Sequence, residues 1–277
     1  MPNKPSVRPS GDQAAQADPH ELYELSVQCA EAEIDFVDAT WKTLRERPAR
    51  LLREDFCGSA LVCAEWIARH KRRHAIGVDL DPDVLAWGRE RHLNPLPAGA
   101  RRRIELRNAN VLTVKTPPAD IILAMNFSYW LFKQRHTLKR YFQRVHAALR
   151  ADGIFFLDAY GGYDAFREIV EEREIAAPSG DFTYIWEQAS YNPIDASLVC
   201  HIHFAFADGS RLERAFSYAW RLWTLAEIRE LLIEAGFRKT TVYWQGFDEN
   251  GEADGVFVPA ESGDADAGWI CYLGAEK

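Results

Sequence analysis

The sequence predicts an α/β fold: a doubly wound, mostly parallel seven-stranded sheet with one antiparallel strand, plus a small antiparallel β insert after the fifth strand. Two observations predict it. From residue 51 to about 173, short apolar runs alternate with amphipathic segments, and each parallel strand needs such a crossover to return to the sheet. Between about 180 and 220 this alternation stops, and three strand-like runs follow one another without helices between them.

The strands of the main sheet are predicted from apolar runs of ordinary strand length. These runs cover residues 51–56, 75–80, 103–108, 120–126, 153–159, 237–244 and 268–275. Amphipathic segments predict crossover helices over 60–70, 82–92, 138–150 and 163–173. Only an acidic, Gly-rich loop separates the last two strands, so we expect them to pair antiparallel.

The insert is predicted to hold strands at 182–189, 198–206 and 211–219, joined by turn signals at Asn192-Pro193 and Asp208-Gly209. A helix follows it. Thr224 and Glu227 have the spacing of a capping box, and Gly236 ends the segment.

The N-terminal part differs in composition from the rest. Residues 1–18 mix Pro, Gly, Ser, Gln and Ala without periodicity, which predicts a disordered arm. Ile34, Val37, Trp41 and Leu44 then recur at helical spacing. We therefore expect an arm over 1–18, a helical cap over 19–48, and one domain over 49–277 whose insert at 180–220 forms a substrate lid.

Composition limits the partners of the chain. The net charge of −8 argues against a general nucleic-acid binder, although the basic runs 71–73 and 101–103 leave a local patch open. The five cysteines are scattered and form no C-x-x-C pair, which suits reduced thiols and argues against structural zinc. No stretch resembles a signal core or the roughly 20 apolar residues of a membrane span, so we expect a cytoplasmic protein without a membrane partner.

A nucleoside site is predicted where the first two strands end. Strand one runs into Cys57-Gly58-Ser59-Ala60, a small-residue turn followed at once by a helix, which lets a ligand approach the backbone N–H groups. Strand two ends at Asp79, 21 positions after Gly58. A carboxylate there can accept hydrogen bonds from both hydroxyls of an adenosine ribose.

These residues resemble the motifs of class I (Rossmann-like) S-adenosylmethionine-dependent methyltransferases of the small-molecule type. Glu54 resembles the acidic residue before their Gly-x-Gly-x-Gly turn, and Gly77 to Pro82 resembles their second motif. Later segments resemble them in order: 108–111, 120–126, 149–158 and 231–237. The resemblance implies methyl transfer with S-adenosyl-L-methionine as cofactor. The cofactor-binding residues that it implies are Tyr23, Glu54, Phe56, Cys57, Gly58, Ser59, Ala60, Asp79, Leu80, Asn110, Val111 and Asn126.

The sequence departs from that pattern at three positions. Phe56 and Ala60 occupy two of the three glycine positions of the turn. Asn110 replaces a carboxylate, although its carbonyl can still accept from the adenine amine. A nicotinamide dinucleotide fits less well, because its fingerprint requires glycine at the positions of Phe56 and Leu61.

The acceptor site is predicted at the end of strand four. The run 126–130 resembles the Asn-Pro-Pro-Tyr element of amino-methylating enzymes without its prolines, which implies that Asn126 orients the acceptor and Tyr129 stacks on it. Packing is the alternative role for Tyr129. The insert, with its aromatic residues, resembles a substrate lid. The predicted substrate contacts are Tyr129, Trp130, Tyr160, Arg221 and Trp223.

Two histidines project from the polar face of one insert strand. His201 and His203 could ligate a metal, but no carboxylate at ligand spacing completes the set, so we predict no metal site. His201 is a candidate catalytic base, with a solvated or packed histidine as the alternative.

Three functions are compatible with these features. The acidic chain and the aromatic insert favour methylation of an N or O atom of a small molecule. The alternatives are an RNA or protein methyltransferase, which the basic runs would support, and a non-catalytic cofactor-binding protein, which the lost glycines suggest. The sequence does not identify the acceptor or the oligomeric state, and a homodimer stays open.

Overall fold

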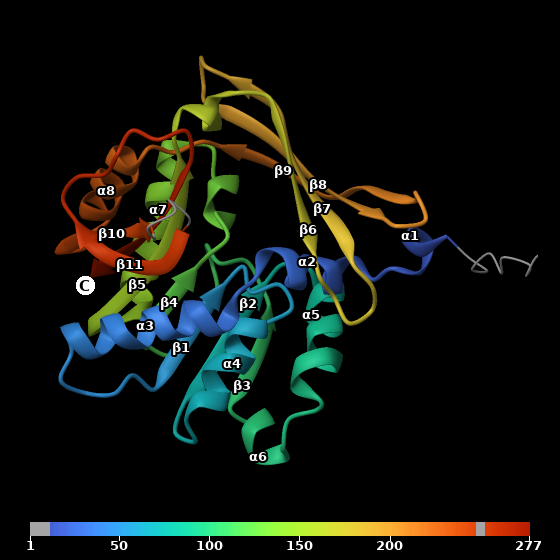
Figure 1. Cartoon of the computed structure of the whole chain (residues 1–277). Helices are drawn as coiled ribbons and strands as arrows, with labels where there is room; N and C mark the ends of the chain where they lie inside the picture. Colours follow the sequence, from blue (N-terminus) through green and yellow to red (C-terminus); the bar gives the residue numbers. More distant parts are fainter. Residues whose placement is uncertain (1–11, 248–252) are drawn as a thin grey trace, which may run out of the picture.

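The computed structural model describes residues 12–247 and 253–277 and has the predicted α/β architecture (Figure 1). The strands of the main sheet are β1 (Leu51–Asp55), β2 (His74–Asp79), β3 (Ile104–Asn108), β4 (Ala119–Ala124), β5 (Leu149–Gly161), β10 (Lys239–Phe247), β11 (Ala253–Ala260) and β12 (Trp269–Glu276). The helices are α1 (Gln13–Gln16), α2 (Pro19–Val27), α3 (Ala30–Leu44), α4 (Leu61–Arg69), α5 (Pro82–Gly88), α6 (Ala98–Arg101), α7 (Arg135–Ala148) and α8 (Leu225–Glu234). Short helical turns are η1 (Arg89–Leu93), η2 (Ser128–Leu131) and η3 (Tyr163–Phe166).

The order of the main sheet is β11-β10-β12-β5-β4-β1-β2-β3. Strands β3, β2, β1, β4 and β5 are parallel to one another, and β12 is antiparallel to both of its neighbours, β5 and β10. The prediction of a mostly parallel sheet with a reversed last strand is therefore confirmed. The parallel strands end along one edge of the sheet, which is where ligands of open α/β folds bind.

Helices cover both faces of the sheet. On β4, Ile121 and Leu123 pack with α3 and α4, whereas Ile122 and Ala124 pack with α7 and α8. This alternation explains why the strand is apolar throughout, since a parallel strand between two helical layers is buried on both sides. None of the described helices is both long and apolar enough to cross a membrane.

A second, antiparallel sheet stands above the carboxyl edge of the main sheet, close to α2 (Figure 1). This insert sheet consists of β6 (Ile169–Ile175), β7 (Phe182–Asn192), β8 (Ser197–Phe206) and β9 (Arg211–Arg221). The three predicted insert strands are present. The helix predicted over 163–173 is not: this segment forms η3 and then the edge strand β6, which pairs with β7 along its whole length. Cross-strand pairing outweighs the helical propensity of its Glu-rich sequence.

Two further segments differ from the expectation. Residues 253–260 of the predicted acidic loop form β11, an eighth strand that pairs with β10 at the edge of the sheet, and Pro259 is tolerated at such an edge. Of the predicted disordered arm, residues 1–11 lie outside the described residues. Residues 13–16 form α1, because the Asp12 side chain accepts a hydrogen bond from the Ala14 N–H and the Gln13 N–H donates to Asp208 of the insert.

Candidate functional site

The predicted nucleoside site lies at the carboxyl edge of β1 and β2. These strands are adjacent and parallel, with Asp55 opposite Val78. The Gly58 N–H donates to one carboxylate oxygen of Asp79 over 2.9 Å, and the Asp81 N–H donates to the other over 3.0 Å. The turn and the carboxylate therefore form one structural unit, as the sequence predicts.

The turn after β1 keeps a glycine-like backbone without the glycines. Phe56, Gly58 and Ala60 have φ values of 60°, 50° and 62°, all in the left-handed region. An L side chain in that region costs about 1–2 kcal/mol, so the surrounding structure must hold Phe56 and Ala60 there. The Phe56 ring packs 5.6 Å from that of Tyr141, measured between centroids, and Ala60 is fully buried. Packing thus replaces glycine in shaping this turn.

The segment after β4 is held by a buried carboxylate. Asn126 and Phe127 both have left-handed φ values, 57° and 55°. Their N–H groups donate to the two oxygens of Asp158, over 2.7 and 2.9 Å. Asp158 lies on the neighbouring strand β5, and burial raises the pKa of its carboxyl group to about 7. We call these two hydrogen bonds the Asp158 clamp. They hold the backbone so that the Asn126 side chain lines the adjoining cavity, where it makes no hydrogen bond to the described residues.

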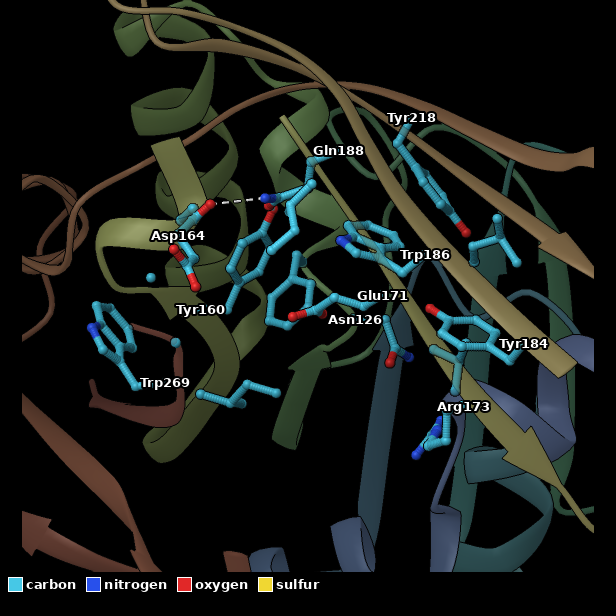
Figure 2. A pocket seen from close by; sticks show the side chains of 18 of the residues that line it. Asn126, Tyr160, Asp164, Glu171, Arg173, Tyr184, Trp186, Gln188, Tyr218 and Trp269 are labelled. Atoms are coloured by element: carbon cyan, nitrogen blue, oxygen red, sulfur yellow. Dashed lines mark hydrogen bonds between the residues drawn. The ribbon is translucent and has the colours of Figure 1, made fainter. Parts of the chain in front are cut away.

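A pocket of about 850 Å³ opens between the carboxyl edge and the insert sheet (Figure 2). Asn126 lies at its floor, and Tyr23 of α2 also lines it. Aromatic rings form much of the wall: Phe127, Tyr160, Tyr184, Trp186, Tyr218, Trp220 and Trp269. A concave, largely aromatic cavity with a few polar groups is typical of a small-molecule site.

Two further carboxyl groups, those of Glu54 and Glu33, are buried near the carboxyl edge of the main sheet. Glu54 accepts a hydrogen bond from the Cys63 N–H over 3.1 Å, and burial raises its pKa to about 8. Glu33, in the first turn of α3, is 5% exposed, and burial followed by the charges of Glu54 and Asp158 raises its pKa well above the usual range. Such groups are stabilised by a cationic partner.

Glu54 makes the stability of the ligand-free protein depend on pH. Its folded pKa of about 8 exceeds that of an unfolded glutamate, so its stabilising contribution is complete at acidic pH and is lost as the pH rises to about 8. We expect the free energy of unfolding to fall by about 3 kcal/mol between pH 5 and 8 through this group. Urea denaturation should show a smaller decrease for Glu54→Gln. The exposed Glu90→Gln is the control, and an unchanged decrease in Glu54→Gln would contradict the assignment.

Comparison with known proteins identifies the fold. No protein-family model and no curated protein matches the chain. Solved structures do: a Clostridium acetobutylicum S-adenosylmethionine-dependent methyltransferase matches with 14% identity, a TM-score of 0.66 and coverage of 92% of this chain and 96% of that one. An amino pentose methyltransferase of Micromonospora echinaspora, involved in calicheamicin biosynthesis, matches with 15% identity, a TM-score of 0.65 and coverage of 93% and 96%. A sugar N-methyltransferase of a Streptoalloteichus species matches with 13% identity, a TM-score of 0.65 and coverage of 100% and 98%. The chain has the class I methyltransferase fold.

Within this methyltransferase fold, the predicted cofactor residues gather at one edge. Leu80 is 65% exposed beside Asp79, where a flat base can lie on it. Asn110 is exposed at the same edge, and its side-chain oxygen accepts from the Leu112 N–H over 2.8 Å, while Val111 is buried. Ser59 is hydrogen-bonded to Glu24 of α2, which brings this helix over the turn.

Tyr129 and Trp130 are not available to an acceptor. Both are fully buried, and neither lines the pocket. The left-handed pair 126–127 sends the chain into η2, which turns both side chains back into the core, and the Tyr129 hydroxyl donates to the Asp158 carbonyl over 2.8 Å. The packing alternative is therefore correct for Tyr129.

Three predicted residues of the insert region also lie away from the main pocket. Arg221 donates to Glu227 over 2.7 Å and lies over the Trp223 ring, so its charge is already paired. Trp223 lines a smaller cavity of about 300 Å³. His201 is hydrogen-bonded to Ser217 and projects from the face of β8 opposite to Ile202, which does line the pocket. Tyr160, the remaining predicted substrate contact, lines both cavities.

Sequence reasoning missed Asp158, Glu33 and Glu171. Asp158 could have been found, because strand five adjoins strand four and its carboxyl end must meet Asn126. Glu33 carries no such signal, since an acidic residue in the first turn of a helix is common. Glu171 was missed because its segment was predicted to be a helix, which would not have placed it on the insert sheet.

Proposed function

We propose that this protein transfers the methyl group of S-adenosyl-L-methionine to an N or O atom of a small molecule. The observation that carries the proposal is the carboxyl edge of the neighbouring strands β2, β1 and β4, which carries Asp79, the 56–60 turn and Asn126, with the aromatic pocket opening at Asn126. The cytoplasmic location expected from the sequence is part of the proposal.

The residues present fit this cofactor. Asp79 would hold the ribose hydroxyls, Asn110 and Leu80 the adenine, and the 56–60 turn the methionine end. The cofactor carries a positive ammonium and a positive sulfonium group, which suit the buried carboxyl groups Glu54 and Glu33. S-adenosyl-L-methionine supplies a methyl carbon already attached to a good leaving group.

The protein then has mainly to align the acceptor and exclude water. The acceptor lone pair would form the new bond to the methyl carbon while the carbon–sulfur bond breaks and leaves its electron pair on sulfur, and the acceptor would release its proton to water. Alignment of this kind can contribute on the order of 7–11 kcal/mol. Asn126, fixed by Asp158, would orient the acceptor through its free carboxamide, and the insert sheet would cover it.

Two observations favour a small acceptor over a macromolecule. The basic runs 71–73 and 101–103 precede β2 and β3, and therefore lie at the amino edge, opposite to the pocket. Arg73 is also paired with Asp38 and covers the Trp66 ring. The non-catalytic alternative rests on the missing glycines, and the left-handed backbone kept at 56 and 60 weakens it.

Titration calorimetry with S-adenosylhomocysteine tests the cofactor site. We expect the wild-type protein to bind it and Asp79→Ala to bind it about 10- to 100-fold more weakly, because the ribose loses a charge-assisted hydrogen-bond acceptor. Asp83→Asn, an exposed change on α5, is the control.

Absence of binding to the wild-type protein would refute the proposal. If binding is observed, transfer of labelled methyl groups into fractionated cell extract distinguishes the acceptors. Label in the low-molecular-mass fraction is the expected result, and label confined to RNA or protein would favour the macromolecular alternative.

A further inference from the structure

The inner face of the insert sheet carries a carboxylate in an aromatic surface. Side chains alternate between the two faces of a strand, so Ile169, Glu171 and Arg173 share one face of β6. They pair with Gln188, Trp186 and Tyr184 of β7, which line the pocket. Figure 2 shows Glu171 turned into the pocket near Trp186 and Asn126.

Glu171 has no ion pair or hydrogen bond through its carboxylate with any described residue. Two other charged residues that line the pocket, Arg173 and Asp164, have partners of their own. Arg173 donates to the Ser26 carbonyl and lies 5.5 Å from the Tyr184 ring centroid, pointing away from Glu171 (Figure 2). Asp164, on the other side of the pocket, is paired with Arg167 at 2.7 Å. A free negative charge therefore faces the cavity beside the predicted acceptor-orienting residue.

We propose that Glu171 is the acceptor-binding carboxylate and that the acceptor is a small organic amine that enters as its ammonium form, passes one proton through Glu171 to water, and then attacks the methyl carbon with the lone pair that this frees. This inference rests on the proposed function and specifies the substrate class of the same pocket.

The chemistry of the wall supports an ammonium group over other acceptors. A carboxylate binds an ammonium group through a charge-assisted hydrogen bond, and aromatic faces attract the same cation. An anionic acceptor beside Trp186 would be repelled by Glu171, because the Arg173 guanidinium points away toward the Ser26 carbonyl and Arg221 lies outside the pocket. A neutral alcohol could donate a hydrogen bond to Glu171 but would form no ion pair with it, so it would gain less from this carboxylate than an ammonium group does.

Matched probes test the proposal. Cyclohexylammonium and cyclohexanol have the same ring and differ in charge, and each is titrated into the protein with and without saturating S-adenosylhomocysteine. Pocket tryptophan fluorescence reports binding. We expect the ammonium probe to bind the wild-type protein roughly tenfold more tightly than the alcohol. Glu171→Gln should lower the ratio to roughly two to three, because only the aromatic faces would still favour the cation, whereas Glu168→Gln, an exposed change just outside β6, should leave it near ten.

The outcomes separate the two proposals. Equal affinities in the wild-type protein overturn the assignment of Glu171 even if the variant is unstable, and an unchanged ratio in the folded Glu171→Gln variant overturns it as well. Failure of S-adenosylhomocysteine to bind refutes the methyl-transfer proposal, while the titration without it still tests the amine site.

Discussion

Replacing Asp158 with asparagine is expected to lower kcat for methyl transfer about 100-fold while changing KM little. The two N–H groups of Asn126 and Phe127 donate to separate oxygens of this carboxylate, and an asparagine side chain has one oxygen and one NH₂ group. One backbone N–H would then face another donor. The left-handed pair would shift, and a displacement of about 1 Å at an aligning residue costs on the order of 100-fold in rate.

A pH profile separates this positioning role from a general loss of stability. The Asp158 carboxyl group has a pKa of about 7, and only its ionised form accepts from both N–H groups through two carboxylate oxygens. The wild-type rate should therefore rise as the pH increases through about 7, and Asp158→Asn should lack this rise. Asp83→Asn is the control. A variant with wild-type kcat and the same pH profile would show that the clamp does not matter for the reaction.

The position of the proposed cofactor-binding residues could be predicted because it depends only on short sequence segments at the ends of neighbouring strands. The 56–60 turn follows one strand, and Asp79 ends the next, so the parallel pairing of β1 and β2 brings them together without further assumptions. The same logic places Asn126 at that edge. Sequence alone could not show that Phe56 and Ala60 adopt the backbone of the glycines they replace, because distant packing on α7 and in the core holds them.

The acceptor side was harder to predict because its geometry depends on tertiary contacts. Tyr129 and Trp130 follow a strand at the right edge, yet the left-handed backbone at 126–127 turns them inward, and Asp158 of another strand fixes that backbone. Likewise, 169–175 becomes a strand because β7 provides an edge for it. The residues that contact the acceptor therefore depend on pairings that no local pattern specifies.

Replacing Arg53 with methionine is expected to destabilise the protein by about 3–5 kcal/mol, because the change leaves the buried carboxylate of Asp55 without its ion pair. Arg53 and Asp55 are both almost fully buried on β1, and two guanidinium nitrogens donate to the two carboxylate oxygens over 2.7 and 3.0 Å. The Tyr141 hydroxyl donates to Asp55 over 2.9 Å and cannot neutralise the charge. Urea denaturation at pH 7 measures the effect.

The double variant Arg53→Met, Asp55→Leu tests whether the loss of stability comes from the unpaired, buried carboxylate of Asp55. Removing both partners of a buried pair is often close to neutral, so the double variant should recover most of the lost stability. The single variant should lose less stability at pH 5 than at pH 8, because burial raises the pKa of the Asp55 carboxyl group and Arg53 opposes that rise. Equal losses in the single and double variants would mean that the packing of the Arg53 side chain, and not its charge, supports the strand. Because Asp55 directly precedes Phe56, the single variant should also bind S-adenosylhomocysteine more weakly, which would connect the buried pair to the shape of the cofactor turn.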